Sequence, residues 1–334
     1  MLRLPAFEYH RPETVEEAAR LLDDFGDAAI PIAGGTDLVP NLKHRLFEPE
    51  HLVSLRGLRE LRGIEVRGAE LVIGAGESLA AVAAHPLVRR HAPSVARAAG
   101  LVAGPQLRNM GTIGGNLCLD TRCTYYNQTF FWRQALGFCL KKDGDTCHVT
   151  RVGRKCVAAH SADTPPALMT LGASVDFLSA AGERSVPVAD LFVADGIWNT
   201  VRRRDEILLR VRVPVPGADT RTAFRKVRQR NAIDFPLLNL AVACEMDADE
   251  RVVAVRLVVS ALGSRPRAVS GLDEIAAGRR LDAEVVDAIA AKAYQQCRPL
   301  TNIIVDPEWR RAMVPVHVRR ALRQLRDGPA TPTA

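Results

Sequence analysis

The sequence is poor in aromatic residues and in cysteine, and it has no long apolar run. Aromatic side chains make up 5% of the 334 residues, and there are seven cysteines. A nucleic-acid-binding surface combines a basic stripe with stacking aromatics. Here the arginines are scattered along the whole chain, so the net charge of +7 predicts no nucleic-acid partner. No stretch reaches the roughly 18 consecutive apolar residues of a transmembrane helix, and we expect no membrane span.

The first residues, MLRLPAFEYHRPET, also lack the apolar core and small-residue cleavage site of a signal peptide. We therefore expect a cytoplasmic protein, in which thiols stay reduced. In that setting clustered cysteines indicate metal or redox chemistry more than disulfides. The 47% of hydrophobic and 25% of charged residues are those of an ordinary globular chain.

The pattern of apolar residues and turns predicts two domains, over 1–217 and 218–330. Helix and strand signals alternate in the first, until Pro214, Pro216 and Gly217 mark a linker. The second reads as a separate α+β domain. The predicted elements include strands at 52–55, 70–76 and 207–214, and helices at 15–25 (capped by Thr14), at 79–90 with an interruption near Pro86, near 282–296 and at 308–326.

A glycine loop follows the first apolar strand. In PIAGGTDLVP (31–40), Gly34 and Gly35 let the backbone approach a diphosphate, and consecutive N–H groups can form an anion-binding concavity to which Thr36 adds a hydroxyl. The G-x-G-x-x-G spacing of a Rossmann loop and the Gly-Lys-Ser/Thr of a Walker A loop are both absent. Taken alone, an ordinary turn is the simpler interpretation of this loop.

A second glycine loop, RNMGTIGGNL (108–117), has the same chemistry about 75 residues further on. Gly111, Gly114 and Gly115 frame Thr112, and Asn116 follows. Two such loops could grip one diphosphate from opposite sides. This pairing is far more specific than either loop, and the alternative is two unrelated tight turns.

After Asn116 the pattern breaks, and residues 118–160 are loop-like. A loop of this length inside a compact domain is usually functional or disordered, and its cysteines and aromatics argue against disorder. It holds no Cys-x-x-Cys pair, which a structural zinc site generally uses. Four thiolates are also the donor set of an iron–sulfur cluster, so iron–sulfur, zinc and unligated thiols all remain open. We expect Cys118, Cys244 and Cys297 to be packed, inert thiols.

The two glycine loops, as AGGTDL and RNxGTxGGN, resemble the FAD-binding subunit or domain of the xanthine dehydrogenase family. SADTPPAL, ILLRVRVP and AFRKVRQRNAIDFP extend the resemblance over essentially the whole chain. It implies an α+β fold, with a two-subdomain FAD-binding unit of the vanillyl-alcohol-oxidase type and a C-terminal α+β flavoprotein domain. No segment of the sequence can be assigned to NAD, and we expect no NAD site.

The resemblance implies which residues contact FAD. The first loop would hold the diphosphate, the second would add backbone and hydroxyl contacts, and a lysine would lie near the isoalloxazine and stabilise reduced flavin. The alternatives without a cofactor are a helix N-cap role for Asp163 and a solvated strand position for Lys226. The implied residues are Ile32, Ala33, Gly34, Gly35, Thr36, Asp37, Val102, Thr112, Gly114, Gly115, Asn116, Asp163, Leu209 and Lys226.

The cysteine-rich insertion is similar to that of one branch of the family, the flavin subunit of 4-hydroxybenzoyl-CoA reductase. The matching stretches are DTRCTYYNQ, GFCLKKDGDTCHV and RKC. The resemblance implies a 4Fe–4S cluster on Cys123, Cys139, Cys147 and Cys156. Basic residues between these ligands are expected on a solvated face, or alternatively they offset the cluster charge or meet an acidic donor: Arg133, Lys141, Lys142, Arg151, Arg154 and Lys155.

The resemblance further implies an electron-transfer subunit of a molybdenum hydroxylase-type complex that is not catalytic alone. Its partners would be a large molybdopterin-binding subunit and a small subunit with two 2Fe–2S clusters, in a dimer of heterotrimers with a ferredoxin as donor. The reaction would be reductive removal of the phenolic hydroxyl of 4-hydroxybenzoyl-CoA. The alternatives are the flavin subunit of an oxidising hydroxylase for an aromatic, a purine or carbon monoxide, a zinc-stabilised binding protein, and a free-standing flavin oxidase.

Overall fold

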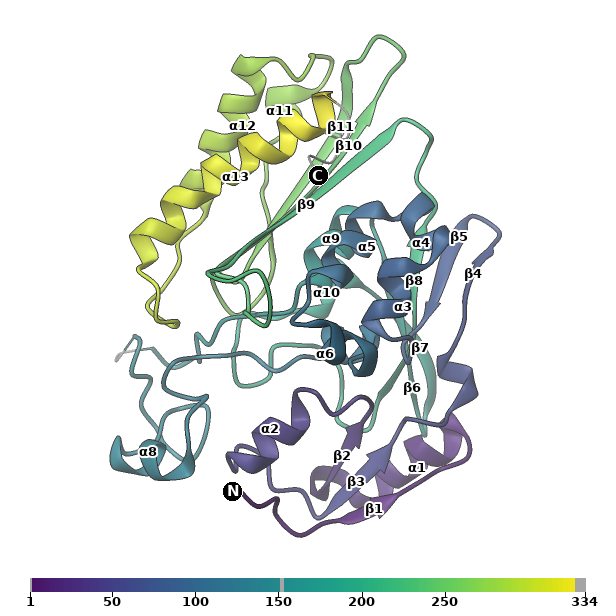
Figure 1. Cartoon of the computed structure of the whole chain (residues 1–334), viewed down its shortest axis with the longest axis vertical. Coiled ribbons are helices and arrows are strands. Elements are labelled where there is room, and N and C mark those ends of the chain that lie inside the picture. Colours follow the sequence, from purple (N-terminus) through teal and green to yellow (C-terminus); the bar gives the residue numbers. More distant parts are fainter. Residues whose placement is uncertain (1, 151–152, 328–334) are drawn as a thin grey trace.

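The structure, a computed structural model, describes residues 2–150 and 153–327 (Figure 1). A small parallel sheet opens the chain, with strands β1 (Glu8–His10), β3 (His51–Ser54) and β2 (Ala29–Ile32) in that order. The helix α1 (Val15–Phe25) makes the crossover between β1 and β2 and buries its apolar face, which includes Leu22. Its cap is the predicted one, because the Thr14 hydroxyl accepts a hydrogen bond from the Glu17 N–H.

The second sheet is antiparallel and has five strands in the order β4-β5-β8-β6-β7. Pro86 ends one helix and begins the next, as the sequence predicts, because proline cannot donate to the preceding turn. The elements are β4 (Ile64–Arg67), β5 (Glu70–Gly74), β6 (Ser174–Ser179), β7 (Gly182–Pro187) and β8 (Ile207–Pro214), with the helices α3 (Leu79–Ala84), α4 (Pro86–His91), α5 (Pro93–Gly100), α9 (Thr164–Thr170) and α10 (Val188–Leu191).

The C-terminal part is a four-stranded antiparallel sheet with its long helices on one face (Figure 1). On its second strand, Leu240, Val242 and Cys244 pack under these helices, while Ala241 and Ala243 face the core of the preceding domain. This alternation follows from the two-residue period of a strand. The elements are β9 (Thr220–Val227), β10 (Leu238–Met246), β11 (Val252–Ser260), β12 (Arg267–Ala268), α11 (Asp273–Ala276), α12 (Ala283–Gln296) and α13 (Pro307–Asp327).

The insertion, of which the structure describes residues 118–150 and 153–160, lies outside the three sheets and projects at the lower left of Figure 1. It is irregular, as predicted, except for a short helix that the sequence analysis missed, α8 (Phe130–Ala135), which the Thr129 hydroxyl caps at the N–H of Trp132. The insertion is tied to the C-terminal domain, because the N–H of Thr124 donates to the Asn302 carbonyl and the Asn302 amide donates to the carbonyl of Val157.

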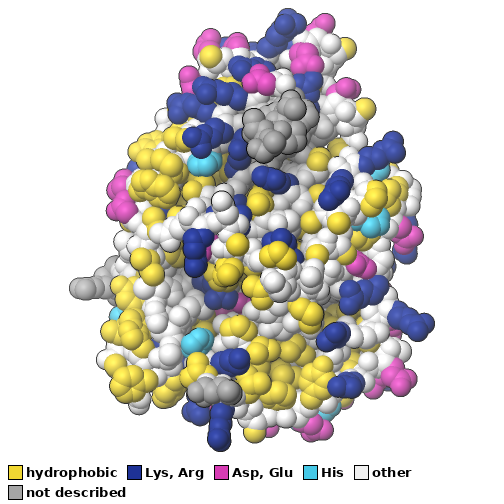
Figure 2. Space-filling model, in the orientation of Figure 1, with side chains coloured by type: hydrophobic (Ala, Val, Ile, Leu, Met, Phe, Trp, Pro, Cys, Tyr) yellow, Lys and Arg dark blue, Asp and Glu magenta, His cyan; other side chains and the backbone are white. Residues whose placement is uncertain are grey.

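Charged side chains on one face, the helices and the thiols outside the insertion bear on the analysis of composition. Lys and Arg side chains are spread over the face shown in Figure 2 and do not form one stripe. Within 2–150 and 153–327, no helix has both the length and the apolar character that a membrane crossing requires. Cys244 and Cys297 are buried in the C-terminal core, as expected, and Cys118 packs against the core of the larger sheet.

Candidate functional site

The two glycine loops lie against each other, although about 75 residues separate them. The first loop links β2 to α2 (Leu38–Lys43), and the second links α6 (Pro105–Met110) to α7 (Ile113–Leu117). A Cβ atom on Gly34 would lie 1.9 Å from the Met110 carbonyl oxygen, and one on Gly111 would lie 3.2 Å from the Thr36 hydroxyl. Only glycine permits this close approach of two backbones.

The first loop presents unused backbone donors. Its strand ends at Ile32, whose carbonyl accepts a hydrogen bond from the N–H of Leu55. Gly35 has φ +69°, a left-handed conformation that turns the chain. The N–H groups of Ala33, Gly34, Gly35 and Thr36 donate to no acceptor within residues 2–150 and 153–327. Consecutive free N–H groups around a left-handed glycine form the kind of concavity that binds phosphate.

In the second loop, backbone N–H groups already donate hydrogen bonds within the protein. The Gly115 N–H donates to the Thr112 hydroxyl, which caps α7, and the Gly114 N–H donates to the Ala75 carbonyl. A Cβ on Gly114 would lie 2.8 Å from the Ala75 Cβ. The side chain of Asn116 accepts hydrogen bonds from Thr164 at 3.1 and 2.7 Å. This loop therefore shapes the site more than it supplies free N–H donors.

Asp163 and Lys226 form a buried pair beside these loops. The Lys226 Nζ lies 2.6 Å from a carboxylate oxygen of Asp163 and donates to the Leu101 carbonyl, next to Val102. The Asn239 amide donates to the other oxygen of Asp163, and burial raises the pKa of this carboxyl, an effect that Lys226 opposes. The solvated position considered for Lys226 is wrong, since its side chain is 1% exposed.

Asp163 and Leu209, two further residues of the predicted set, are both buried. Asp163 occupies the N-cap position of α9, but its side chain makes no capping hydrogen bond. Leu209 is buried in the core beneath α1, and its carbonyl accepts a hydrogen bond from the N–H of Ala75, the residue against which Gly114 packs. The structure thus brings Leu209 to the second loop through its backbone.

The four predicted cysteine ligands line a single small cavity in the insertion. Cys123, Cys139, Cys147 and Cys156 surround it, together with aromatic residues such as Tyr126. Tetrahedral zinc, with bonds of about 2.3 Å to sulfur, would draw the thiolates to roughly 3.8 Å from one another. Among the described residues, no three of these sulfur atoms lie mutually within 4.8 Å. The four sulfur atoms therefore do not have the close spacing that a single tetrahedral zinc ion requires.

Charge near this cavity comes from a buried lysine. The Lys141 ammonium lies on the cavity wall, pairs with Asp120 at 2.6 Å and is 4% exposed. Burial opposes ionisation of the Cys147 thiol, but hydrogen bonds from Thr150 and neighbouring N–H groups outweigh it and lower the pKa of that thiol. Burial raises the pKa of Cys156 to about 11, an effect that the N–H of Ala158 opposes.

The prediction that the basic residues of the insertion lie on a solvated face is wrong for two of them. Besides Lys141, the side chain of Arg133 is 1% exposed, and its guanidinium donates to the carbonyls of His44 and Arg45 at 3.2 and 3.0 Å. Lys142 is partly exposed and pairs with Asp143 at 3.2 Å. Arg154 and Lys155 are exposed, as expected. The remaining basic residue of that set, Arg151, lies outside the described residues.

One residue that connects the two sites was missed by the sequence analysis. Arg122 precedes Cys123, forms an ion pair with Asp37 of the first loop, and lies 4.0 Å over the ring of Phe235. Asp37 also accepts a hydrogen bond from Asn41. The available signal was the DTRCT stretch itself, in which the arginine is adjacent to the first ligand cysteine.

Comparison with protein families identifies the class of chain to which this fold and site belong. The family model described as FAD binding domain in molybdopterin dehydrogenase matches residues 5–216, and the one described as CO dehydrogenase flavoprotein C-terminal domain matches residues 222–325. The chain belongs to this family of FAD-binding chains of molybdopterin dehydrogenases. The predicted family resemblance, fold class and FAD cofactor are thereby confirmed.

Individual relatives extend over most of the chain. The carbon monoxide dehydrogenase medium chain of Hydrogenophaga pseudoflava is 29% identical over 320 residues, covering 95% of this chain and 96% of its own length. An aldehyde oxidoreductase FAD-binding subunit of Escherichia coli is 34% identical over 259 residues, covering 75% and 80%. The solved structure of the Hydrogenophaga pseudoflava carbon monoxide dehydrogenase that lacks the Mo-pyranopterin moiety of the molybdenum cofactor superposes with a TM-score of 0.80 at 28% identity, over 96% of this chain and 97% of that one.

Proposed function

We propose that the paired glycine loops hold FAD, with its diphosphate on the free N–H groups of the first loop. The observation that carries this assignment is the close contact of Gly34 with the Met110 carbonyl, which sets the two loops side by side and which no Cβ at position 34 would permit. When bound, FAD exchanges electrons singly or in pairs. The proposed contact residues are Ile32, Ala33, Gly34, Gly35, Thr36, Asp37, Val102, Thr112, Gly114, Gly115, Asn116, Asp163, Leu209 and Lys226.

The chain's own residues would set the surroundings of the flavin. Because Lys226 is already held by Asp163, its position is fixed before any ligand binds. The pair would orient one cationic donor toward the ring without a further loss of side-chain freedom. Burial of both side chains also keeps water away from this wall of the site.

We further propose that Cys123, Cys139, Cys147 and Cys156 bind a 4Fe–4S cluster. The support is their convergence on one cavity, the four-thiolate donor set, and the fact that, within the described part of the chain, no three of their sulfur atoms lie mutually within 4.8 Å. Lys141 on the cavity wall would offset part of the negative charge of four thiolates. The zinc alternative requires closer sulfur atoms than these.

This proposal is tested by cysteine substitution in the chain purified anaerobically with its cofactors. Iron, sulfide and the EPR signal after dithionite reduction would be measured for Cys139→Ser and Cys147→Ser. Cys118→Ser and Cys297→Ser are matched controls, because these thiols are packed in the cores. We expect iron to be lost in the first two variants alone. Equal iron content in all four variants would show that Cys139 and Cys147 do not bind the cluster.

At the level of the complex, the chain would be the electron-transfer subunit of an oxidising molybdenum hydroxylase. Relatives named as dehydrogenases of carbon monoxide, nicotinate and xanthine support this direction. By the same reasoning it would assemble with a large molybdopterin-binding subunit and a small subunit with two 2Fe–2S clusters. Electrons would leave the substrate at molybdenum and reach FAD in this chain.

A second candidate is the reductive direction, in a complex of the 4-hydroxybenzoyl-CoA reductase type. The observation that favours it is the cysteine insertion, with its DTRCTYYNQ and GFCLKKDGDTCHV stretches. A ferredoxin would then supply electrons to this subunit.

The native complex, studied anaerobically, distinguishes the two directions. Bleaching of the flavin absorbance by an aldehyde, an N-heteroaromatic or a purine would establish the oxidising direction. Formation of benzoyl-CoA from 4-hydroxybenzoyl-CoA with reduced ferredoxin would establish the reductive one. A chain isolated without flavin would contradict both.

A further inference from the structure

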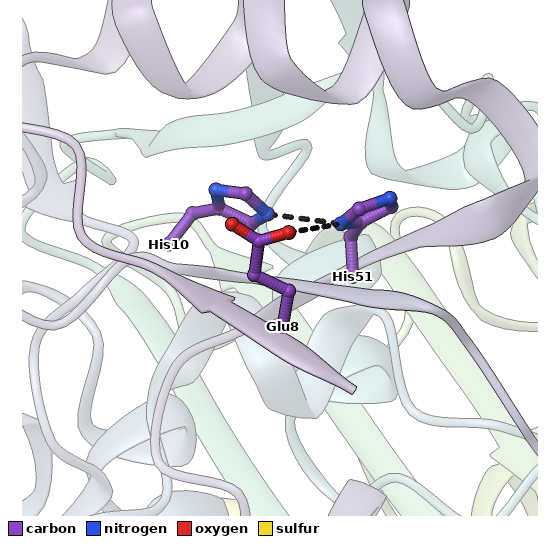
Figure 3. Close-up of side chains that lie close together, drawn as sticks. All are labelled: Glu8, His10 and His51. Atoms are coloured by element: carbon purple, nitrogen blue, oxygen red, sulfur yellow. Dashed lines mark hydrogen bonds and ion pairs between the residues drawn. The ribbon is translucent and has the colours of Figure 1, made fainter. Parts of the chain in front are cut away.

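Three metal-ligating side chains meet on the N-terminal sheet, away from both sites described above (Figure 3). Glu8 and His10 are two residues apart on β1, so they point to the same face of the sheet. In the parallel register of β1 and β3, Glu8 lies opposite His51, which brings the second imidazole to that face. Backbone pairing alone therefore places two histidines and a carboxylate side by side.

The distances between their donor atoms suit one shared ion. His10 Nε2 lies 3.0 Å from His51 Nδ1, and a carboxylate oxygen of Glu8 lies 3.7 Å from the same Nδ1. One ligand atom from each residue falls within 4.8 Å of the other two. Zinc bonds of about 2.0–2.2 Å to nitrogen and oxygen separate neighbouring ligands by roughly 3.4 Å in a tetrahedron. The His10–His51 distance of 3.0 Å is shorter than this separation, and the Glu8–His51 distance of 3.7 Å is longer.

Packing holds the imidazoles in this orientation. Phe25, the last residue of α1, stacks on the His51 ring with centroids 3.8 Å apart and planes inclined by 16°. The same phenyl ring contacts the His10 ring at 5.1 Å. Both rings are thus oriented before an ion arrives, which lowers the entropic cost of binding. The Glu8 side chain is 68% exposed, so water can reach the site and complete the coordination.

We propose that Glu8, His10 and His51 bind one divalent transition-metal ion of the zinc type, which clips β1 to β3. Imidazole and carboxylate donors suit zinc, cobalt and nickel, whereas calcium and magnesium prefer oxygen alone. The hydrogen bond between the rings requires a proton on one of the two facing nitrogens. Binding the ion would need both lone pairs, so that proton moves to the outer nitrogen of its ring as the tautomer changes. The ion would link two residues that are 41 positions apart in the chain.

The site of Glu8, His10 and His51 lies at the opposite end of the N-terminal sheet from the first glycine loop, which we assign to FAD. His51 pairs with Ala29 at the start of β2, whereas Ile32 at its end leads into Ala33. An ion here would therefore stabilise the N-terminal sheet and take no part in electron transfer. The inference is independent of the proposed cluster and of the direction of the reaction.

Cobalt is the probe that distinguishes this site from the cysteines. The chain with its cofactors would be freed of adventitious metal, titrated anaerobically with Co²⁺, and then challenged with Zn²⁺. We expect one equivalent to bind with d–d bands and without thiolate charge transfer, and to be displaced by Zn²⁺. Zn²⁺ should also raise the thermal unfolding temperature of the wild-type chain.

The variants are His10→Asn and the milder Glu8→Gln, with His91→Asn at the end of α4 as the matched histidine control. We expect the affinity for Co²⁺ to fall at least about tenfold in His10→Asn and Glu8→Gln and to stay unchanged in the control. Equal binding in His10→Asn and wild type would overturn the proposal. So would thiolate charge-transfer bands for the bound Co²⁺, or no saturable binding, which would leave the two histidines as a hydrogen-bonded pair only.

Discussion

The guanidinium of Arg122 is paired with the carboxylate of Asp37, which joins the first glycine loop to the start of the cysteine insertion. The two side chains are about one-fifth and one-quarter exposed. The backbone of Arg122 is itself held by mutual hydrogen bonds with Ala159 at the far end of the insertion. One residue thus fixes the insertion relative to the loop that we assign to FAD.

Replacing Arg122 should weaken FAD binding. In Arg122→Gln the half-buried Asp37 loses its charged partner, and burial already raises the pKa of that carboxyl against the opposing effect of Arg122. A cost of about 1–3 kcal/mol corresponds to a rise of about 5-fold to 150-fold in the FAD dissociation constant. Fluorescence titration of the FAD-free chain measures it. Arg67→Gln, at an exposed pair with Glu65, is the control, and equal affinities in both variants would refute the coupling.

Adding one methyl group to the first loop should abolish FAD retention. In Gly34→Ala the new Cβ would lie 1.9 Å from the Met110 carbonyl oxygen, so the two loops must separate. The flavin-to-protein absorbance ratio of the purified chain reports the result, with circular dichroism as a check of folding. Gly57→Ala is the matched control, because a Cβ there would meet no atom within 4 Å and the φ of Gly57 is not positive. Full flavin content in Gly34→Ala would show that the loops need no direct contact.

Much of the fold could be predicted from sequence because its signals are local. Thr14 caps α1, Pro86 divides α3 from α4, and a mostly apolar stretch marks β10. The two glycine loops were paired by their common chemistry, and the structure does bring them into contact. Each of these inferences depends on residues close together in the chain or, for the glycine loops, on a motif whose chemistry suits a diphosphate.

The features that were missed depend on partners distant in sequence. Arg133 reads as a surface residue, but it is buried by the carbonyls of His44 and Arg45, which are 89 and 88 residues away. Helix α8 spans only six residues, too few to show a period. The histidines of β1 and β3 meet only through strand pairing, which no local pattern encodes.

The buried pair of Asp163 and Lys226 should behave as one unit in stability. Lys226→Met leaves a buried carboxylate without its cation, which costs about 3–5 kcal/mol, whereas the double variant with Asp163→Asn removes both charges. We therefore expect the double variant to be destabilised by less than the sum of the two single variants. Urea unfolding of the FAD-free chain gives the free energies for this cycle. Additive effects would show that the pair contributes no interaction of its own.

Stability should fall in acid through His160. Burial lowers the pKa of this histidine to about 3, from an unfolded value of about 6.5. The unfolded chain therefore binds a proton below about pH 6.5 that the folded chain refuses until about pH 3. The contribution of His160 is complete above pH 6.5 and decreases by about 1.4 kcal/mol per pH unit as the pH falls below it.

The variant His160→Gln removes that proton uptake. We expect a shallower dependence of its unfolding free energy on pH between about pH 6 and 4 than in the wild type. The difference between the two slopes isolates His160 from the carboxylates, which titrate in both chains. Parallel curves would mean that the ring takes up its proton at the same pH in the folded and in the unfolded chain, against the burial that lowers its pKa.

The most direct test of the central claim, that one chain holds both a flavin and an iron–sulfur cluster, is the cofactor stoichiometry of anaerobically purified protein. FAD, iron and acid-labile sulfide would be quantified per chain in the same sample. The account predicts one FAD with about four iron and four sulfide, as four cysteine ligands around one cubane require. One FAD with zinc would replace the cluster by a zinc site, and one FAD with neither metal nor sulfide would leave the four convergent cysteines without a ligand; either result would contradict the cluster.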